Sequence, residues 1–379
     1  MIVVVVVTMV ATLGTVWRSN WIGSHDAGQT RGQDDVAATS AARDFLNGYV
    51  EPDGRVVRRD EGGDVVSEGQ AYGMLIAAAI GDESTFRRVW AWTKSNLSRS
   101  DGLLAWRWLD GAIADPNSAS DADLDAVRAL LLAGSRFSAD DLTEDGRRMA
   151  AAVMSVETVE LTPAEVVAMG SSNPPPPPDA QSRVLVGGNW ATSNPWQINP
   201  SYFNPRAEQQ LSQTDPRWGA MTATHRALLE QLSSQAPLLP DWAQIDDGSV
   251  KAVGHNDVPV QAGLDAARIA IRFSESCSPD DRRLAAALGA ELNAPPMAVG
   301  IRHLDGSPAV EWKHPISLVA AAAADHAAGH DAGADEDLIA AMNLQRDYPS
   351  YYGAAWVALG YLMLRTSMLG SCDASPSAP

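Results

Sequence analysis

The chain has 379 residues, of which 45% are hydrophobic, and it carries a formal net charge of −19. This composition can bury a substantial core and does not indicate disorder. The negative charge argues against nucleic acids and anionic membrane surfaces as partners, because both would repel the protein. It suits a neutral or cationic ligand, although acidic residues also serve solubility alone.

The first residues are apolar, and no charged residue occurs between Ile2 and Trp17. This run is short for a membrane span, which needs about 20 residues. It is typical of a signal peptide or signal anchor, although a basic segment and a clear cleavage site are missing. We therefore predict export, either secreted or tethered outside the cytoplasm, with a signal segment over 1–23 and a linker over 24–44. A buried core strand is the alternative.

Helical periodicity dominates the rest of the chain. The predicted helices cover 37–48, 70–80, 84–97, 119–135, 140–155, 205–213, 217–233, 261–273, 280–292, 315–328, 335–345 and 351–366. The best strand signal is Arg183–Val186. These elements, without a short repeat, predict an all-α domain over 45–366. A ring of paired inner and outer helices is one such architecture, although periodicity alone does not show that the ring closes.

Two segments of biased composition interrupt or follow this domain. The five prolines of Pro174–Pro178 require extended backbone, which predicts a surface loop over 171–180. The tail over 367–379 is rich in Ser, Ala and Pro, and we predict that it is disordered.

The two cysteines, Cys277 and Cys372, do not have the spacing of metal ligands. In an exported protein they could form one disulfide, and otherwise they are two separate thiols. The seven histidines are scattered, with no ligand pair on one helical face. The sequence therefore predicts no metal site.

Two acidic motifs enter strongly apolar predicted helices. Glu68 is followed by about a dozen apolar, small or amide-bearing residues, so its carboxyl group is expected to be desolvated. Such a carboxyl either complements the helix dipole or has the raised pKa of a catalytic acid. Asp121, Asp123 and Asp125 enter the second helix, and three acids are more than capping requires. Asp121 and Asp125 share a face, while Asp123 points elsewhere.

A third acid, Asp265, opens a later helix, and Arg268 lies three residues further on, within ion-pair reach. An ordinary ion pair at the start of a helix explains this spacing equally well. Tryptophan is unusually frequent, with twelve against five phenylalanines. Indole faces stack on sugar rings, but tryptophan is also a core residue.

Several segments together resemble glycoside hydrolase family 8, especially the bacterial cellulases that accompany cellulose synthase. The matching segments, which extend over about 45–365, are SEGQAYGM at 67–74, the Trp-rich stretches within 86–108, NSASDADLDAVRALLLAG at 117–134, NPSYFNP at 199–205, LDAAR at 264–268 and YYGAAWVALG at 351–360. The resemblance implies an (α/α)6 barrel with a cleft across one end. It also implies inverting hydrolysis of β-1,4-glucosidic bonds, with no metal or organic cofactor.

The resemblance also implies roles for single residues, which we carry over as expectations. Glu68 would be the general acid, and Asp265 the base that activates water, with Arg268 as its partner. Asp121 would contact the sugar at the cleavage site. The implied substrate contacts are Trp106, a stacking platform, together with Tyr202, Tyr72 and Asp123. Leu264 stands where the family usually has tyrosine, so Asp123 and Asp257 stay alternative bases.

Other functions remain open at this point. A relative could act on chitosan, mixed-linkage glucan or xylan, or could be a non-catalytic glucan-binding module, although the latter would be expected to lack the acid or the base. A helical ring acting on terpenes would need a motif such as DDxxD, which is absent. We expect a monomer that binds β-glucan and has no nucleic-acid partner, with a cellulose synthase complex as a possible partner.

Overall fold

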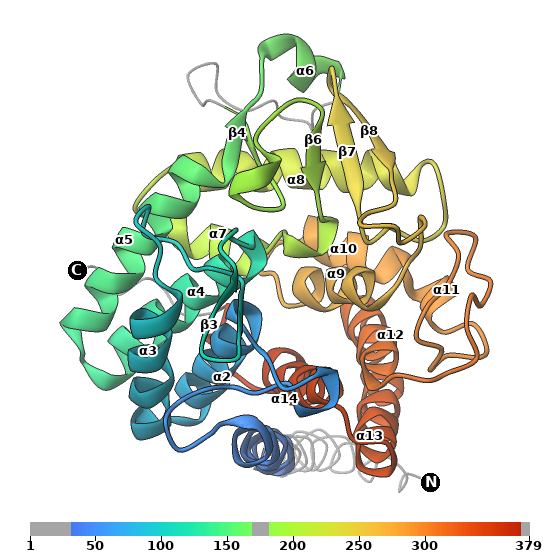
Figure 1. Cartoon of the computed structure of the whole chain (residues 1–379). Coiled ribbons are helices and arrows are strands. Elements are labelled where there is room, and N and C mark those ends of the chain that lie inside the picture. Colours follow the sequence, from blue (N-terminus) through green and yellow to red (C-terminus); the bar gives the residue numbers. More distant parts are fainter. Residues whose placement is uncertain (1–31, 169–181, 373–379) are drawn as a thin grey trace, which may run out of the picture.

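The computed structural model describes residues 32–168 and 182–372, and within them two concentric rings of helices surround one axis (Figure 1). The predicted signal segment over 1–23, Pro174–Pro178 and the last seven residues lie outside the described ranges.

The inner and outer helices alternate along the chain. The inner helices are α2 (Ser67–Ile80), α4 (Ser120–Phe137), α7 (Pro205–Leu211), α9 (Leu264–Ser274), α12 (Pro315–Ala328) and α14 (Tyr351–Arg365). The outer helices are a helix over 32–49, α3 (Glu83–Leu97), α5 (Asp140–Val156), α8 (Arg217–Ser233), α10 (Pro279–Ala287) and α13 (Asp331–Asp347). The short helices α6 (Pro163–Ala168) and α11 (Gly289–Leu292), and three 3-10 turns, η1 (Arg59–Glu61), η2 (Asn189–Ala191) and η3 (Pro200–Tyr202), lie in the connections.

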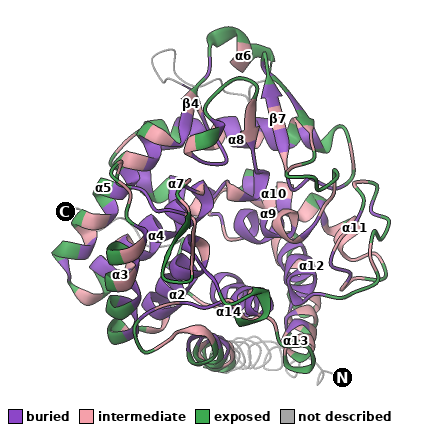
Figure 2. Cartoon of the chain, in the orientation of Figure 1, coloured by how far each residue is buried: buried purple, intermediate pink, exposed green. Residues whose placement is uncertain are grey.

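The sequence of each helix explains its place in the rings. Helix α2 is apolar or small on all sides, and it is buried along almost its whole length. Helix α13 instead buries only Ala334, Leu338 and Ala341, a single stripe at helical spacing, and exposes its charged residues. Figure 2 shows the same contrast, with buried inner helices and an outer ring whose outward faces are exposed.

The inner ring closes on itself. Consecutive inner helices pack against each other around the whole circle, and the last, α14, contacts the first, α2. Two glycines permit close approach: a Cβ on Gly69 would lie 2.6 Å from the Tyr351 hydroxyl, and one on Gly360 would lie 2.5 Å from a methyl group of Val319. Six inner and six outer helices in the described ranges form an (α/α)6 barrel, so the predicted fold is confirmed.

Ion pairs between α4 and α9 cross the interior of the barrel. Their spacing along both helices is four and then three residues, so the pairs form successive rungs of a ladder. The rungs are Asp121–Arg268, Asp125–Arg272 and Arg128–Glu275. The middle rung is bidentate, with two nitrogen–oxygen distances of 2.7 Å. The axis of the barrel is therefore held by matched charges as well as by apolar packing.

Three small antiparallel sheets lie in the described connections and were mostly not predicted. They comprise β1 (Val65–Val66), β2 (Arg107–Leu109) and β3 (Ala112–Asp115); β4 (Thr158–Glu160) and β5 (Arg183–Leu185); and β6 (Trp196–Ile198), β7 (Ala243–Asp246) and β8 (Ser249–Ala252). Only β5 matches the predicted strand signal. Strand β1 runs directly into α2, and β6 leads into η3, so the sheets position the starts of two segments that carry predicted site residues.

Both predicted boundaries of the domain need correction. Residues 32–44, predicted as part of a linker, belong to the outer helix over 32–49, and Ala38 and Ala42 are fully buried in the core. Of the polar residues at the start of the predicted linker that the structure describes, Gln33 and Asp35 are exposed on the first turn of this helix. At the other end, Leu369 is buried, and Cys372 forms a disulfide with Cys277. The folded body therefore extends to residue 372.

None of the helices in the described ranges is both long enough and apolar enough to cross a membrane.

Candidate active site

The starts of three inner helices bring three carboxyl groups together at one end of the barrel. Glu68 is the second residue of α2, Asp121 the second residue of α4 and Asp265 the second residue of α9. All three side chains contact Arg268, which lies one turn into α9. The barrel thus assembles residues that are distant in sequence.

Arg268 is the centre of this cluster, and its side chain is only 1% exposed. Its Nη1 donates to Asp121 Oδ2 at 2.7 Å and lies 3.6 Å from Glu68 Oε2. Its Nη2 donates to Asp265 Oδ1 at 2.8 Å. One guanidinium therefore faces three carboxyl groups, an imbalance that favours protonation of at least one of them.

Glu68 is the carboxyl group of this cluster that can be protonated near neutral pH. Its side chain is 24% exposed, so a substrate can reach it. Burial, the largest cause, and the charges of Asp121 and Asp265 together raise the pKa of Glu68 to about 7, against the opposing charge of Arg268. Desolvation and like charge therefore win over the helix dipole, which by itself would lower this pKa. Near neutral pH the carboxyl group can hold a proton and still release it.

Asp265 is held at both of its oxygens. Besides the contact with Arg268, its Oδ2 accepts a hydrogen bond from Asn199 Nδ2 at 2.7 Å. The side chain is 31% exposed, the most open of the three carboxyl groups. Both neighbours donate to Asp265, and an ionised carboxylate is the acceptor that such donors orient. Because both carboxyl groups contact the same guanidinium, Glu68 Oε2 and Asp265 Oδ1 are at most about 9 Å apart.

Asp121 is much less accessible than the other two carboxyl groups. Its side chain is 2% exposed, and its Oδ1 accepts a hydrogen bond from the Ala122 backbone N–H. Burial raises the pKa of Asp121, and the Arg268 guanidinium opposes this shift. In the structure, its main contact is therefore with Arg268.

Two predicted tyrosines complete the cluster. The Tyr72 hydroxyl lies 3.3 Å from Arg268 Nη1, and the Tyr202 ring lies 5.2 Å from the Arg268 guanidinium carbon, in a cation–π arrangement. Burial raises the pKa of both tyrosines well above 10, so both stay hydroxyl donors at neutral pH. Six of the predicted site residues are therefore neighbours: Glu68, Tyr72, Asp121, Tyr202, Asp265 and Arg268.

A pocket with aromatic walls adjoins this cluster. Trp106 and Tyr202 line it together with Trp190, Trp242 and His255. The Trp242 and His255 rings stack with centroids 4.0 Å apart, and Trp190 and Tyr202 pack against Trp242 at 5.9 and 5.7 Å. Flat apolar faces beside polar edges are the surfaces that sugar rings prefer.

Two acids considered in the sequence analysis lie elsewhere. Asp123 is completely buried, and its Oδ1 accepts a hydrogen bond from the Leu104 backbone N–H. The structure thus provides no surface on Asp123 for the expected substrate contact. Asp257 is exposed, in a turn between the bridged residues His255 and Val258. Neither side chain forms an ion pair with Arg268 in the described residues.

Sequence reasoning missed several contributors to the site. Asn199, which binds Asp265, lies in the quoted NPSYFNP segment but was given no role. Tyr352, from the quoted YYGAAWVALG segment, packs with its ring 6.5 Å from that of Tyr72. Asp241 was not considered: its Oδ1 accepts hydrogen bonds from the backbone N–H groups of Gly263 and Ala266. It thus caps the helix that carries Asp265.

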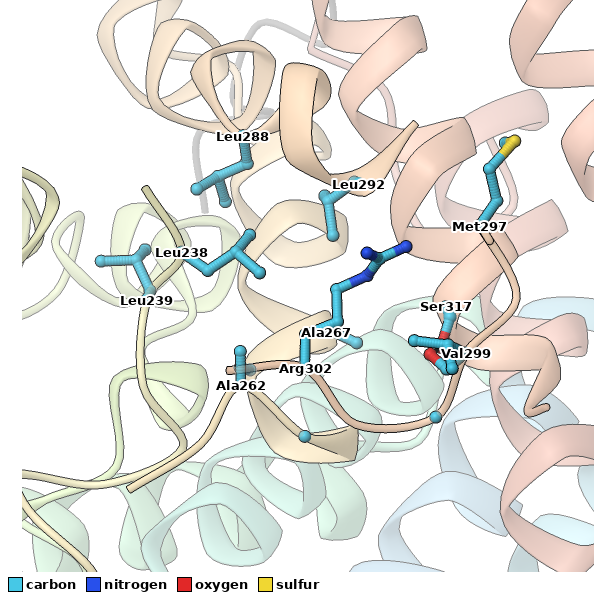
Figure 3. Close-up of a pocket in the computed structure, with 13 residues that line it drawn as sticks. Leu238, Leu239, Ala262, Ala267, Leu288, Leu292, Met297, Val299, Arg302 and Ser317 are labelled. Carbon is cyan, nitrogen blue, oxygen red and sulfur yellow. Dashed lines mark hydrogen bonds between the residues drawn. The ribbon is translucent and has the colours of Figure 1, made fainter. Parts of the chain in front are cut away.

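The first turn of α9 is also supported from behind. Figure 3 shows an apolar pocket there, lined by side chains such as Leu238, Leu292 and Val299. The Arg302 guanidinium donates to the carbonyl oxygens of Gly306, Ala294 and Pro296. The Arg302 backbone exchanges two hydrogen bonds of 2.9 Å with Ala262, just before α9. These contacts fix the position of the helix that carries Asp265.

Within the described ranges, no group of three or more His, Cys, Asp or Glu side chains is arranged to hold a metal ion.

Comparison with known proteins adds three findings. The family model described as glycosyl hydrolases family 8 matches residues 33–290. A probable endoglucanase of Novacetimonas hansenii is 32% identical over 236 residues, covering 60% of this chain and 64% of that protein. An endoglucanase of Salmonella typhi is 29% identical over 212 residues, covering 53% of each. The chain thus spans between half and two thirds of the length of these relatives.

Solved structures share the fold over almost their whole length. The endo-beta-1,4-glucanase CMCax from Acetobacter xylinum superimposes with a TM-score of 0.67 at 25% identity, covering 86% of this chain and 97% of that one. A beta-1,3-1,4-glucanase from Paenibacillus sp. X4 reaches a TM-score of 0.75 at 16% identity, with 88% and 92% covered. The second likeness concerns the fold alone.

Proposed function

This chain belongs to family 8 of the glycosyl hydrolases, and from that premise we propose that it cleaves β-1,4-glucosidic bonds within cellulose or a related glucan. The observation that carries the proposal is the Arg268 guanidinium, which gathers Glu68, Asp121 and Asp265 at one end of the barrel. The endoglucanase names of the relatives support the choice of substrate.

Glu68 is the proposed general acid. The glycosidic oxygen is a poor leaving group, so it must receive a proton as the bond breaks. A carboxyl group with a pKa of about 7 holds that proton at neutral pH, and its partial exposure gives it access to the substrate. When it has lost the proton, Arg268 is placed to stabilise the resulting carboxylate.

Asp265 is the proposed general base. Arg268 and Asn199 hold its two oxygens, which fixes the direction in which the carboxylate faces an attacking water. Inverting enzymes place their two carboxyl groups roughly 6.5–9.5 Å apart, so that water fits between base and sugar. The upper bound of about 9 Å set by the shared guanidinium is compatible with this arrangement. We therefore propose a single displacement with inversion.

Substrate binding is assigned to the aromatic pocket. Trp106 is the proposed stacking platform, and Tyr202 lies between the pocket and Arg268, where it can position a sugar ring at the bond to be cut. The Asp121 carboxylate, nearly buried, is proposed to act chiefly by holding Arg268 in place.

The test is a comparison of substrates followed by analysis of the product. Release of reducing sugar is measured side by side on carboxymethyl cellulose, lichenan, xylan and chitosan, and we expect the highest rate on a β-1,4-linked glucan. Proton NMR of the earliest products should show the α-anomer, because one displacement inverts a β-linkage. A β-anomer as the first product would reject inversion, and a clear preference for xylan or chitosan would reject the substrate.

Export is part of the same proposal. The Cys277–Cys372 disulfide supports it, because such bonds persist in oxidising compartments and are rare in the cytosol. Fractionation of the native host should place the protein outside the cytoplasm, and a full-length cytoplasmic protein would contradict export. Association with a cellulose synthase complex stays a prediction, for which co-purification is the test.

A further inference from the structure

Two buried carboxyl groups lie beneath the cleft, away from Arg268. Asp123 belongs to the first turn of α4, and Glu157 follows the last residue of α5. Both are 0% exposed. Neither forms a salt bridge within the described residues, although the burial of an unpaired carboxylate is costly. The charge of the Arg99 guanidinium is felt by both groups, but Arg99 donates to Asp101 at 2.7 Å instead.

One oxygen of each carboxyl group is used to hold a different part of the cleft. Asp123 Oδ1 accepts a hydrogen bond from the Leu104 backbone N–H, two residues before Trp106. Glu157 Oε1 accepts one from Ser118 Oγ at 2.6 Å. Trp106 and Ser118 both line the aromatic pocket. The pair therefore lies behind two separate segments of the pocket wall.

Both segments extend to further parts of the site. Ser118 Oγ accepts a hydrogen bond from the Asn189 backbone N–H at 3.0 Å, next to Trp190. The Trp106 carbonyl accepts one from the Ser67 backbone N–H at 2.9 Å, next to Glu68. Through these contacts, the carboxyl pair connects the pocket wall on both sides and the start of α2.

The remaining oxygens, Asp123 Oδ2 and Glu157 Oε2, meet no N–H or hydroxyl donor in the described residues. The two carboxyl groups can instead hydrogen-bond each other, with Asp123 as donor. That bond requires a proton, because two carboxylates have no donor between them. We propose that Asp123 and Glu157 share a proton that holds the pocket walls together, and that glucan binding weakens when this proton leaves.

The electrostatic surroundings agree with a proton retained at neutral pH. Burial raises the pKa of Glu157 to about 8, against the hydrogen bonds that it accepts from Ser118 and Asp123. Burial and the charge of Glu157 raise the pKa of Asp123 well above its ordinary value. The other charged groups that face the pair are Asp121, on α4, and Asp101 and Arg99, in the loop after α3. Loss of the proton would leave two buried like charges in contact.

An amide in place of one carboxyl group can supply the hydrogen-bond donor between the two side chains at every pH. In Glu157→Gln, the amide oxygen can accept from Ser118 while its NH2 group donates to Asp123 at any pH. In Asp123→Asn, the amide oxygen can accept from Leu104 while its NH2 group donates to Glu157. Glu157→Ala is the matched control that removes the contact altogether.

The experiment measures binding of cellopentaose by calorimetry between pH 6 and pH 9 in full-length protein carrying Glu68→Gln, which should slow hydrolysis at least about a hundredfold and removes the titration of Glu68. Binding of this ligand rests on the proposed function. In this parent, the dissociation constant should rise several-fold as the pH increases from 6 to 9, because deprotonation of the pair removes the donor between the two carboxyl groups. When Glu157→Gln is added to this parent, the dissociation constant should change less than about twofold over the same pH range. When Glu157→Ala is added instead, the protein should bind cellopentaose weakly at both pH 6 and pH 9.

Burial lowers the pKa of His255 in the same pocket, and the Glu157→Gln protein, which keeps His255, controls for any titration of this ring. An equal loss of affinity with pH in the parent and in the Glu157→Gln protein would overturn the proposal. So would tight binding by the Glu157→Ala protein at pH 6.

A measurement without ligand separates this proposal from the proposed function. Thermal unfolding should show a melting temperature that falls from pH 6 to pH 9 more in the parent than with Glu157→Gln or Asp123→Asn. A carboxyl group whose pKa is raised by folding contributes less stability as pH rises from its unfolded pKa to its folded pKa. If cellopentaose does not bind even at pH 6, the proposed function fails, and the melting curves still decide whether the proton is shared.

Discussion

Two successive rungs between α4 and α9 differ in one respect, the balance of charge. In the deeper rung, Arg272 meets Asp125 alone, through two hydrogen bonds of 2.7 Å. One turn nearer the cleft, Arg268 meets Asp121 and Asp265, and Glu68 lies 3.6 Å away. The same helices therefore carry a matched pair at one level and an excess of carboxyl groups at the next.

The difference shows how one scaffold separates stability from chemistry. A buried, matched pair satisfies its own charges and gives neither partner a reason to change protonation at neutral pH. Three carboxyl groups on one guanidinium cannot all be satisfied, and the charges of Asp121 and Asp265 add to the burial that raises the pKa of Glu68. Catalysis is expected where the charges are unbalanced, and structural support where they are balanced.

The largest effect is expected from Asp265→Asn. Asparagine cannot take the proton from water at neutral pH, so hydrolysis should fall by roughly a thousandfold or more. Its shape should preserve glucan binding and folding, which calorimetry and thermal unfolding check. Azide, as a small nucleophile, should restore part of the activity. A variant that remains active would remove Asp265 from the role of base.

Glu68→Gln should reduce turnover by at least about a hundredfold, because glutamine keeps the size and polarity of the side chain but has no proton to donate. The same variant also lowers the excess negative charge around Arg268. Folding should be preserved, as judged by the melting temperature. Near-normal turnover of the purified variant would exclude the proposed role.

The pH profile reports the charge imbalance in the unmodified protein. Glu68 acts only while protonated, so kcat/KM should decline above a pH of about 7 and then fall roughly tenfold per pH unit. Activity that continues to rise up to pH 9 would show that a different group supplies the proton.

Substitutions in the deeper rung, Asp125–Arg272, should affect catalysis least. Arg272→Met leaves Asp125 buried without its cation, which should cost about 3–5 kcal/mol of unfolding free energy. The double variant Asp125→Leu with Arg272→Met removes both charges and should recover most of this stability. In that double variant, the decline of kcat/KM near pH 7 should stay in place. A large shift of the decline would mean that both rungs act as one electrostatic unit.

The helices could be predicted from sequence because each buries an apolar face at regular spacing, and every predicted helix has a counterpart in the structure. The boundaries were less predictable. The helix over 32–49 begins with polar residues that resemble a linker, and its burial depends on the ring around it. The short strands β1 and β6 have too few residues to show the alternation of apolar and polar residues that marks a strand. Their pairing is set by the barrel around them.

The site was predictable where motifs carry it. Glu68, Asp121, Asp265 and Arg268 were named from the sequence, and the structure places them together, although their catalytic roles are still predictions. Asp123 shows the limit of such reasoning. It stands two residues from Asp121, and helical geometry turns its side chain towards Glu157, which no local pattern connects with it.

The contact of α14 with α2 also has a consequence for folding during synthesis. Synthesis proceeds from the N-terminus, so the surface of α2 that faces α14 stays open until nearly the whole chain has left the ribosome. Arg268, too, joins Glu68 only after most of the polypeptide has been made. A nascent chain therefore contains Glu68, the proposed proton donor, long before Arg268 and α14 can hold it, and we expect hydrolysis only after the last inner helix has joined the ring.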